Sequence, residues 1–228
     1  MITSVLVILL LVVAIFCFWR FYWFFRNPER RVPDCEGLLS PADGKVVYVR
    51  KVGPNEPVFT VKKGQEARLV DILKEDDALP KVIIGVFMSP FDVHYNRAPL
   101  SGTVQAVTHH PAQSRNLHMG PMHWRCVLNH FPLYRNCLHI IQNERTVTRI
   151  LGTFKGNSLT TYIIQIAAKS VHGIDSYIPV GGFVARGTIF GMIRVGSQVD
   201  LVVPWRPDMK IKVVAGERVR AGESVLIA

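Results

Sequence analysis

The hydrophobic pattern of the chain changes once, near residue 25. Residues 2–19 contain no charged side chain and are almost wholly apolar. A stretch of this length is at the lower limit for a helix that spans a bilayer. Residues 21–25 add aromatic side chains of the kind that lie at a membrane interface. We therefore predict that residues 1–25 form a hydrophobic membrane anchor, with a buried core helix as the alternative.

Positive charge follows this apolar run and does not precede it. The basic residues concerned are Arg20, Arg26, Arg30 and Arg31. Flanks rich in Arg and Lys stay in the cytoplasm, so we expect a protein of the cell membrane whose main domain lies on the cytoplasmic side. The basic start and small-residue cleavage site of a secretory signal are both missing. Residues 26–36, charged and interrupted by prolines, are predicted to be a linker.

From residue 37 onward the pattern favours short strands. The predicted strands are 45–49, 59–61, 81–88, 102–107, 146–154, 159–167, 183–195, 199–203, 211–214 and 224–227. Turn residues recur every ~8–12 positions, which is typical of a β-barrel or β-sandwich. We predict a mainly β protein in which residues 37–228 form one barrel-like or sandwich-like domain behind the apolar helix.

The charge balance restricts the partners of this domain. A formal net charge of +10 favours an anionic partner such as nucleic acid, a phospholipid surface or a phosphorylated substrate. The basic residues are dispersed and no nucleic-acid motif is present, so we expect a phospholipid membrane and no nucleic acid. The four cysteines, Cys17, Cys35, Cys126 and Cys137, lack the spacing of a disulfide framework or a zinc finger.

Histidine is concentrated in one segment, residues 109–139. Six of the eight histidines lie there, and His118, His123 and Cys126 suggest a zinc site at first sight. Their spacing is irregular and no carboxylate lies among them, so we predict no metal. We predict instead a long basic amphipathic loop, inserted in the β domain, that lies on a membrane surface or over an active site.

One dipeptide, Gly196-Ser197, falls between two predicted strands. Glycine leaves its carbonyl unshielded by a side chain, and the next hydroxyl is a potential nucleophile if a base removes its proton. A Gly-Ser pair between strands is also what a β-bulge or tight hairpin looks like. The dipeptide alone does not decide between chemistry and a turn.

Several motifs in a fixed order extend this observation. They occupy residues 24–30, 40–47, 88–99, 143–145, 190–197 and 213–228. Taken together they closely resemble phosphatidylserine decarboxylases of the short, membrane-associated type, from about residue 24 to the end of the chain. Residues 109–142 depart from the family pattern, and we assign no chemical role to Asn143-Glu144-Arg145.

The resemblance implies an enzyme that makes its own cofactor. Such a precursor cuts itself between Gly196 and Ser197, after Ser197 Oγ attacks the Gly196 carbonyl. Elimination and hydrolysis then convert Ser197 to a covalent pyruvoyl group. This group forms a Schiff base with phosphatidylserine and accepts electrons as carbon dioxide leaves, giving phosphatidylethanolamine. The two fragments are expected to stay together as a complex, and a homo-oligomer is compatible with the sequence.

Three further site residues follow from the same resemblance. Asp43, in the Pro-Ala-Asp-Gly turn, is the family's acid, and His94 is its first histidine. Longer members carry a second histidine where this chain has Arg97, so we assign both processing and proton donation to His94. Arg97 would suit the phosphate or carboxylate of the substrate. The structural alternatives are a turn aspartate, a histidine at a strand end and a solvated loop arginine.

Two other functional classes fit parts of the chain. The tetrapeptide at residues 208–211 and the glycine spacing at residues 216–225 resemble a biotinyl or lipoyl carrier domain. Only five residues separate Lys210 from Gly216, which is too few for the half-domain that follows a carrier lysine. A non-catalytic, membrane-anchored β-barrel adaptor is the other class, because a fold does not by itself determine a function.

Overall fold

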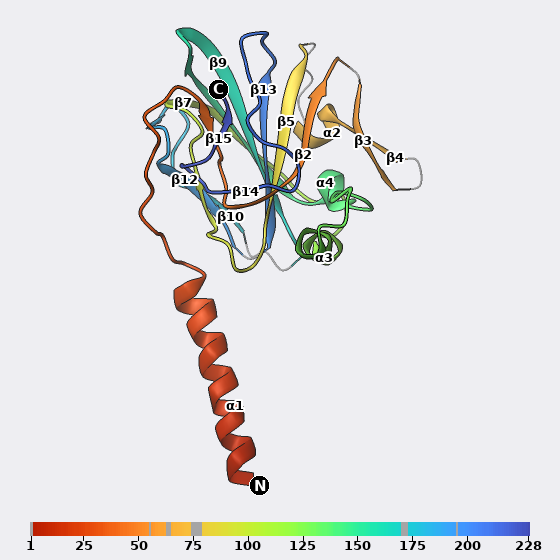
Figure 1. Cartoon of the computed structure of the whole chain (residues 1–228), viewed down its shortest axis with the longest axis vertical. Coiled ribbons are helices and arrows are strands. Elements are labelled where there is room, and N and C mark those ends of the chain that lie inside the picture. The colour runs from red at the N-terminus through yellow and green to blue at the C-terminus, as the bar shows by residue number, and fades with distance from the viewer. Residues whose placement is uncertain (1, 55, 63–64, 74–78, 170–172, 195) are drawn as a thin grey trace.

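The computed structural model describes residues 2–54, 56–62, 65–73, 79–169, 173–194 and 196–228. An apolar helix projects from one end of a β domain (Figure 1). This helix consists of α1 (Ile2–Cys17) and a π-helical continuation, η1 (Phe18–Trp23). Together they are long and apolar enough to cross a membrane, and none of their residues is buried. A buried core helix, the alternative from sequence, is therefore wrong.

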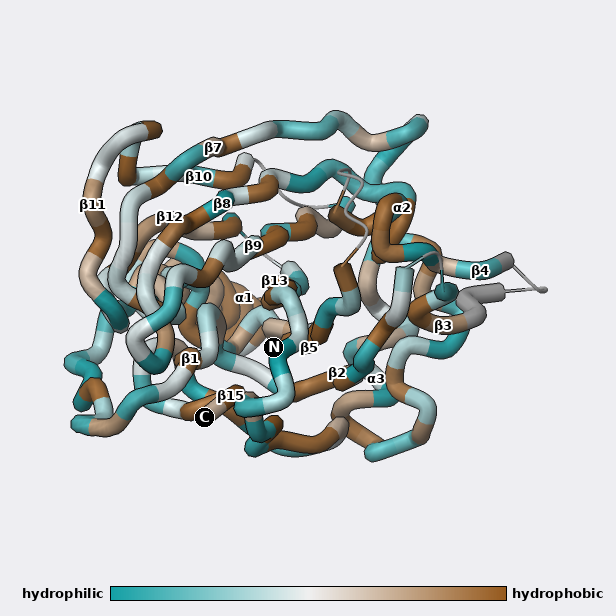
Figure 2. Tube along the Cα trace, turned by 90° about the horizontal axis from the view of Figure 1, so that it is seen from above, coloured by the Kyte–Doolittle hydropathy of each residue, from teal (hydrophilic) through white to brown (hydrophobic). Residues whose placement is uncertain are grey.

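One antiparallel sheet forms most of the β domain. Its strands lie in the order β11 (Phe183–Val184), β7 (Gly102–His110), β8 (Arg145–Phe154), β9 (Asn157–Ala167), β13 (Ser197–Pro204), β5 (Lys81–Met88), β2 (Gly44–Val52) and β14 (Arg218–Val219). The sheet curls into half of a barrel, and the strands turn around its inner face when viewed from above (Figure 2). The prediction of a mainly β, barrel-like core is confirmed.

Smaller elements cover the two faces of this sheet. A three-stranded sheet contains β10 (Ile174–Ser176), β12 (Ile189–Ile193) and β6 (Tyr95–Arg97), while β1 (Leu38–Leu39) pairs with β15 (Val225–Ile227) and β3 (Pro57–Lys62) with β4 (Gln65–Arg68). The helices of the domain are α2 (Leu69–Leu73), α3 (Gly120–Leu128) and α4 (His139–Gln142). Two hydrophobic cores lie on opposite faces of β13. Val199 and Leu201 point into the first core, and Val202 points into the second core, on the second face of the sheet.

The structure differs from the sequence pattern in three places. The predicted strand 183–195 is divided into β11 and β12 by a turn at Gly187, whose φ of 79° favours glycine. The end of that prediction, Val195, lies outside the described residues. The predicted strand 211–214 is reduced to one bridge, between Ile211 and Ile227. The histidine-rich insertion contains α3 and α4, both of which pack part of their surface into the second core.

A hydrogen-bonded network of buried polar side chains holds β13 on the second face. Gln198 Nε2 donates to Asp200 Oδ1 and to the Tyr48 hydroxyl, both at 2.7 Å, and Tyr48 donates to Asp200 Oδ2 at 2.7 Å. His139 Nε2 on α4 lies 3.3 Å from Gln198 Oε1. Burial raises the pKa of Asp200 to about 6 and lowers that of His139 to about 4. The network links α4 to the residue that follows Ser197.

The raised pKa of Asp200 predicts a pH-dependent stability. Folding favours the protonated carboxyl, so this contribution is complete below the ordinary pKa of 3.8 and is lost as pH rises through about 6. The loss amounts to about 3 kcal/mol of unfolding free energy. Asp200→Asn should remove this pH dependence, as measured by urea unfolding in detergent between pH 4 and 7.

Both chains in this comparison carry Ser197→Ala, so that neither is cut. His94 and His139 act in the opposite direction, because burial lowers both of their pKa values to about 4. Both histidines are present in both chains, and the contribution of His94, which has no described contact with Asp200, cancels in the difference. His139 shares Gln198 with Asp200, so the measured difference includes the coupling of these two groups. Parallel curves of unfolding free energy against pH would show that Asp200 does not titrate in this range.

Candidate active site

The Gly196–Ser197 bond lies where the chain crosses between two sheets. β12 ends at Ile193 in the three-stranded sheet, and β13 begins at Ser197 in the large one. The dipeptide is therefore not a hairpin turn, because the strands on either side of it do not pair. Gly196 has a φ of 64°, in the left-handed region that favours glycine. Ser197 is fully buried.

Both reacting groups of this bond have defined partners. The Gly196 carbonyl accepts a hydrogen bond from the Ala168 backbone amide at 3.1 Å. The Ser197 hydroxyl donates to Met88 Sδ at 3.3 Å. A thioether is a weak acceptor, so the hydroxyl proton is only weakly held. The site thus combines a polarised carbonyl with an adjacent hydroxyl that is free to react.

His94 is a candidate base that lies beside the end of β12. Its carbonyl accepts the Ile193 amide at 3.4 Å, which places it beside the end of β12. Nδ1 lies 2.9 Å from the Asp92 carbonyl, which can only accept, so Nδ1 carries the proton. Nε2 is buried and has no hydrogen-bond partner among the described residues. The imidazole therefore has a free lone pair on Nε2.

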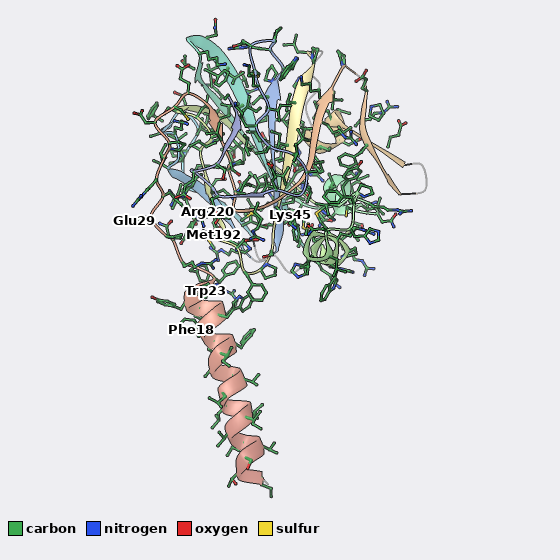
Figure 3. The ribbon with its side chains drawn as sticks, viewed as in Figure 1. Phe18, Trp23, Glu29, Lys45, Met192 and Arg220 are labelled. Carbon is green, nitrogen blue, oxygen red and sulfur yellow. The ribbon has the colours of Figure 1, made fainter. Side chains whose placement is uncertain are left out.

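The base is covered by the segment that leaves the apolar helix. The Phe24 ring lies 4.2 Å from the His94 ring, between centroids, at an interplanar angle of 36°. Phe24 is fully buried, and Trp19 of η1 packs against it edge-on at 6.2 Å. Burial lowers the pKa of His94 to about 4, so the side chain is neutral at pH 7. Figure 3 shows this junction, with Phe18 and Trp23 at the end of the helix.

Asp43 lies in a different set of contacts from the one expected. Its Oδ2 accepts a hydrogen bond from Arg30 at 2.8 Å, and its Oδ1 accepts the Ala221 amide at 2.7 Å. In the described part of the chain, no hydrogen bond or ion pair joins Asp43 to His94. Asp43 ties the 26–36 segment to the turn before β15, and its role as the acid of the site stays a prediction.

Arg97 also binds protein groups in this structure. One guanidinium nitrogen donates to the Gly187 carbonyl at 2.8 Å and the other to Asn27 Oδ1 at 2.7 Å. Burial, followed by repulsion from Arg30, lowers its pKa. Arg97 is thus part of a positively charged region beside the anchor junction, by which we mean residues 18–25, where the apolar helix meets the β domain. Its contact with substrate stays a prediction.

Two buried polar residues near Ser197 were missed from sequence. Gln165 Nε2 donates to Asn96 Oδ1 at 2.8 Å, and Asn96 Nδ2 lies 3.8 Å from the Met88 sulfur that also binds Ser197. Both side chains are fully buried, and Gln165 Oε1 has no partner among the described residues. The only hint in the sequence is Gln165, a single side-chain amide within the mostly apolar run 159–167. In the structure Gln165 pairs with Val199 and faces the same core.

The motif Asn143-Glu144-Arg145 acquires a structural role. Arg145 is buried and donates to the carbonyls of Ile140 and Ile72 at 2.8 and 3.2 Å. The Asn143 side chain donates to the carbonyl of Ala167 at 2.7 Å. Together they hold α4, α2 and β9 around the second core. Arg145 therefore holds these elements together through hydrogen bonds to backbone carbonyls.

The histidine-rich insertion was also tested as a metal site. Among the described residues, no group of three or more His, Cys, Asp or Glu side chains is placed to hold a metal ion. Burial raises the pKa of Cys126 to about 11, so its thiol stays protonated at neutral pH. A metal-binding cysteine must lose that proton.

Comparison with known proteins decides the family. The model of the family described as phosphatidylserine decarboxylase matches residues 18–227. The chain belongs to the phosphatidylserine decarboxylase family. It is 34% identical over 207 residues to a phosphatidylserine decarboxylase proenzyme of Syntrophus aciditrophicus, with 90% of this chain and 77% of the relative covered. A second phosphatidylserine decarboxylase proenzyme, from Oleidesulfovibrio alaskensis, is 33% identical over 218 residues. The match covers 95% of this chain and 81% of that relative.

A third relative differs in its named lipid. The putative archaetidylserine decarboxylase proenzyme of Methanothermobacter thermautotrophicus is 34% identical over 209 residues, covering 89% of this chain and 78% of the relative. The resemblance stated from the sequence motifs is confirmed, and the chain is an enzyme of this decarboxylase family. The names of all three relatives mark them as proenzymes, that is, precursors that must be processed. The carrier and adaptor alternatives are therefore set aside.

The stacking of Phe24 on His94 predicts a shifted pH profile for self-cleavage. If His94 is the base, the cleavage rate should be constant from pH 8 down to pH 5 and should fall near its pKa of about 4. Phe24→Ala lets water reach the ring, so the half-maximal pH should rise by about 1–2 units toward the ordinary histidine value. Precursor from cell-free synthesis, transferred to buffers of different pH, gives the rates by mass spectrometry.

Phe91→Ala is the matched control. Phe91 also lies at the junction, 6.3 Å from Trp19 between ring centroids, but its ring is 64% exposed. Its removal should leave the pH profile unchanged. Equal profiles for Phe24→Ala and the parent chain, or unchanged cleavage in His94→Ala, would place the base elsewhere.

Proposed function

We propose that this chain decarboxylates a serine phospholipid, phosphatidylserine, with a pyruvoyl group that it makes from its own Ser197. Given the family, the proposal rests mainly on the arrangement around the Gly196–Ser197 bond. The buried Gly196–Ser197 bond has its carbonyl held by the Ala168 amide, and a neutral His94 with a free Nε2 lies beside the same crossing. These are the parts that an intramolecular acyl shift requires: a nucleophile, a polarised carbonyl and a base.

Self-cleavage begins with attack of Ser197 Oγ on the carbonyl carbon of Gly196. Nε2 of His94 takes the hydroxyl proton, and the Ala168 amide stabilises the negative charge that develops on the Gly196 oxygen. The C–N bond then breaks, its nitrogen takes up a proton, and an ester joins the two residues. His94 and Ser197 share no hydrogen bond in the described structure, but catalytic hydrogen bonds often form only as the reaction proceeds.

The ester is then resolved by elimination. Loss of the Ser197 α-proton expels the Gly196 carboxylate from Cβ and leaves dehydroalanine at position 197. Water adds to its imine tautomer, ammonia leaves, and a ketone remains at the new N-terminus. Ser197 is buried, and the Met88 sulfur that accepts a hydrogen bond from its hydroxyl also contacts the Asn96–Gln165 pair. The pyruvoyl group supplies a ketone that captures the substrate amine and accepts the electron pair released with carbon dioxide.

The substrate's phosphate and carboxylate find positive charge next to this site. Arg26, Arg30 and Arg97 lie close enough to influence one another's pKa values, directly or through Asp43. The guanidinium of Arg97 is suited to hold an anionic headgroup once it releases Asn27. We assign to His94, which would receive the proton of Ser197 during processing, the return of a proton to the substrate carbon as well. Phosphatidylserine and archaetidylserine relatives match this chain to the same 34% identity. The proposal therefore rests on the shared serine headgroup.

The proposal assigns a place to each part of the chain. Residues 1–25 anchor the protein in the cell membrane, residues 26–36 link the anchor to the domain, and residues 37–228 form the decarboxylase domain on the cytoplasmic side. The trailing arginines support this sidedness. After cleavage, β13 stays hydrogen-bonded to β5 on one edge and β9 on the other. Both neighbours belong to the larger fragment, so the two fragments should remain one complex.

The test of this chemistry is the mass of the mature protein. Cleavage should give a fragment of residues 1–196 and one of 228 − 196 = 32 residues that begins at position 197. The small fragment should resist Edman degradation, because a ketone replaces its amine. Ser197→Ala should give one uncut, inactive chain, because alanine supplies no attacking oxygen. Intact-mass measurement, with decarboxylase assays on both serine lipids, provides the readout.

Ser197→Thr is the matched control, since it keeps a hydroxyl at the same position but adds a methyl group in a buried site. It should cut at a reduced rate, and its processed fragment would carry a ketone with one additional methyl group. Borohydride in the presence of substrate should trap an adduct on the small fragment of the parent chain and none on Ser197→Ala. Full decarboxylase activity in an uncut chain would overturn the mechanism.

Two truncations should separate anchoring from catalysis. Removal of residues 1–17 takes away α1 alone, so the protein should leave the membrane and still cut itself. Removal of residues 1–25 also removes the buried Phe24 that covers His94. Loss of a buried phenylalanine costs about 3–5 kcal/mol, so this chain should be less stable and should process poorly. Flotation with vesicles and intact mass measure the two effects, and equal processing by both truncations would show that Phe24 does not support the site.

A further inference from the structure

Helix α3 carries an exposed apolar face that the domain does not use. Met122 and Cys126, four residues apart, are buried in the second core. On the other side of the helix, Trp124, Val127 and Leu128 are 63%, 56% and 70% exposed. Their spacing of three and four residues makes one continuous stripe. α3 is thus apolar both on the side that enters the core and on the exposed side that carries the stripe.

The position of α3 is firmly held. Lys45 Nζ donates to the Cys126 carbonyl at 2.6 Å and to Asn129 Oδ1 at 2.7 Å. Asn129 ends the helix in the left-handed conformation, with a φ of 52°. The stripe is therefore presented by a rigid element and is not the side of a loose loop.

The segment around α3 is positively charged. Residues 110–143 contain three arginines and no Asp or Glu. Arg115 and Arg135, on either side of the helix, are exposed. An apolar stripe with basic flanks is the combination that binds the headgroup region of an anionic bilayer.

The stripe also lies at the end of the domain where a bilayer is expected. Figure 1 shows α3 at the same end from which α1 leaves the domain. A chain of contacts connects the two: Phe91 packs near Trp19, Asp92 forms an ion pair with Arg218, and Arg218 pairs with Lys45 beside α3. The anchor junction and α3 thus border one continuous surface.

We propose that α3 is a second membrane contact, in which Trp124, Val127 and Leu128 enter the interface of an anionic lipid bilayer. This proposal rests on the anchoring of residues 1–25 described under the proposed function. Two contacts would restrict the rotation of the domain about a single helix and keep the face that contains the anchor junction against the lipid headgroups. The partner is the lipid surface itself, because the basic flanks and the anchor end of the domain both favour it over a protein.

Single-thiol probes in the full chain test the proposal. The exposed Cys17 and Cys35 can be replaced by serine, while Cys126 and Cys137 are buried and react poorly. Leu128→Cys then reports on α3. Phe183→Cys, at a residue 68% exposed on β11, is a control of matched exposure on a different element. A chain that keeps only Cys17 as its exposed thiol reports on the anchor.

Each chain is labelled with an environment-sensitive fluorophore and reconstituted in vesicles of phosphatidylcholine and phosphatidylglycerol. We expect the Leu128 probe to emit at shorter wavelength and to be quenched by spin-labelled lipid, whereas the Phe183 probe is not quenched. The shift should be smaller in vesicles of phosphatidylcholine alone, because the basic flanks then lack anionic lipid.

The probes separate the two proposals. Quenching at Cys17 with none at Leu128 would overturn the α3 contact with lipid and would leave the anchor in place. The exposed stripe would then be a surface for a protein partner. Quenching at Leu128 with none at Cys17 would support the α3 contact and overturn the anchor. Equal quenching at Leu128 and Phe183 would overturn the proposal as a specific contact.

Discussion

The hydrogen bonding of β13 on both of its edges is the constraint on which the rest of the structure depends. Ser197 is paired with Met88 of β5 and with Ala167 of β9, so the proposed nucleophile begins a strand that is held on both edges. A reaction within one chain gains most when both reacting groups are held before it starts. The same pairing places the Ala168 amide against the Gly196 carbonyl, because Ala168 directly follows the strand that β13 pairs with. Strand pairing and the hydrogen bond to the Gly196 carbonyl are therefore one arrangement, and under the proposed mechanism the same pairing would retain the small fragment after the cut.

Burial of the base is the second constraint, and it joins the chemistry to the membrane segment. An imidazole in water would be partly protonated near its ordinary pKa of 6.5, whereas His94 beneath Phe24 is neutral with a pKa of about 4. The arrangement has a cost, since Nε2 has no partner among the described residues and an unpaired buried polar atom is unfavourable. Unpaired buried polar atoms of this kind are expected at functional sites. Because Phe24 follows the apolar helix, the position of that helix influences the environment of the base.

The sequence predicted what depends on local pattern and missed what depends on contacts between distant segments. Strand 81–88 was predicted at the bounds of β5, because β5 is buried throughout and reads as a continuous apolar run. Ser197 and His94 were found from motifs, and the family they indicate is confirmed. The stacking of Phe24 on His94 joins residues 70 positions apart, and the Asp43–Ala221 bond joins residues 178 apart, so no local pattern contains them. Helix α3 was predicted as loop, because its apolar residues lie on both sides of a helix of only nine residues.

The alternation of side chains along β13 separates the helices of the histidine-rich insertion from Ser197. Ser197 faces the core that contains Met88 and Val199, whereas Gln198 faces the core that contains α3 and α4. The link from α4 to β13 passes through Gln198 and His139, one residue beyond the nucleophile. The proposed lipid contact of α3 and the proposed chemistry of Ser197 thus lie on opposite faces of β13.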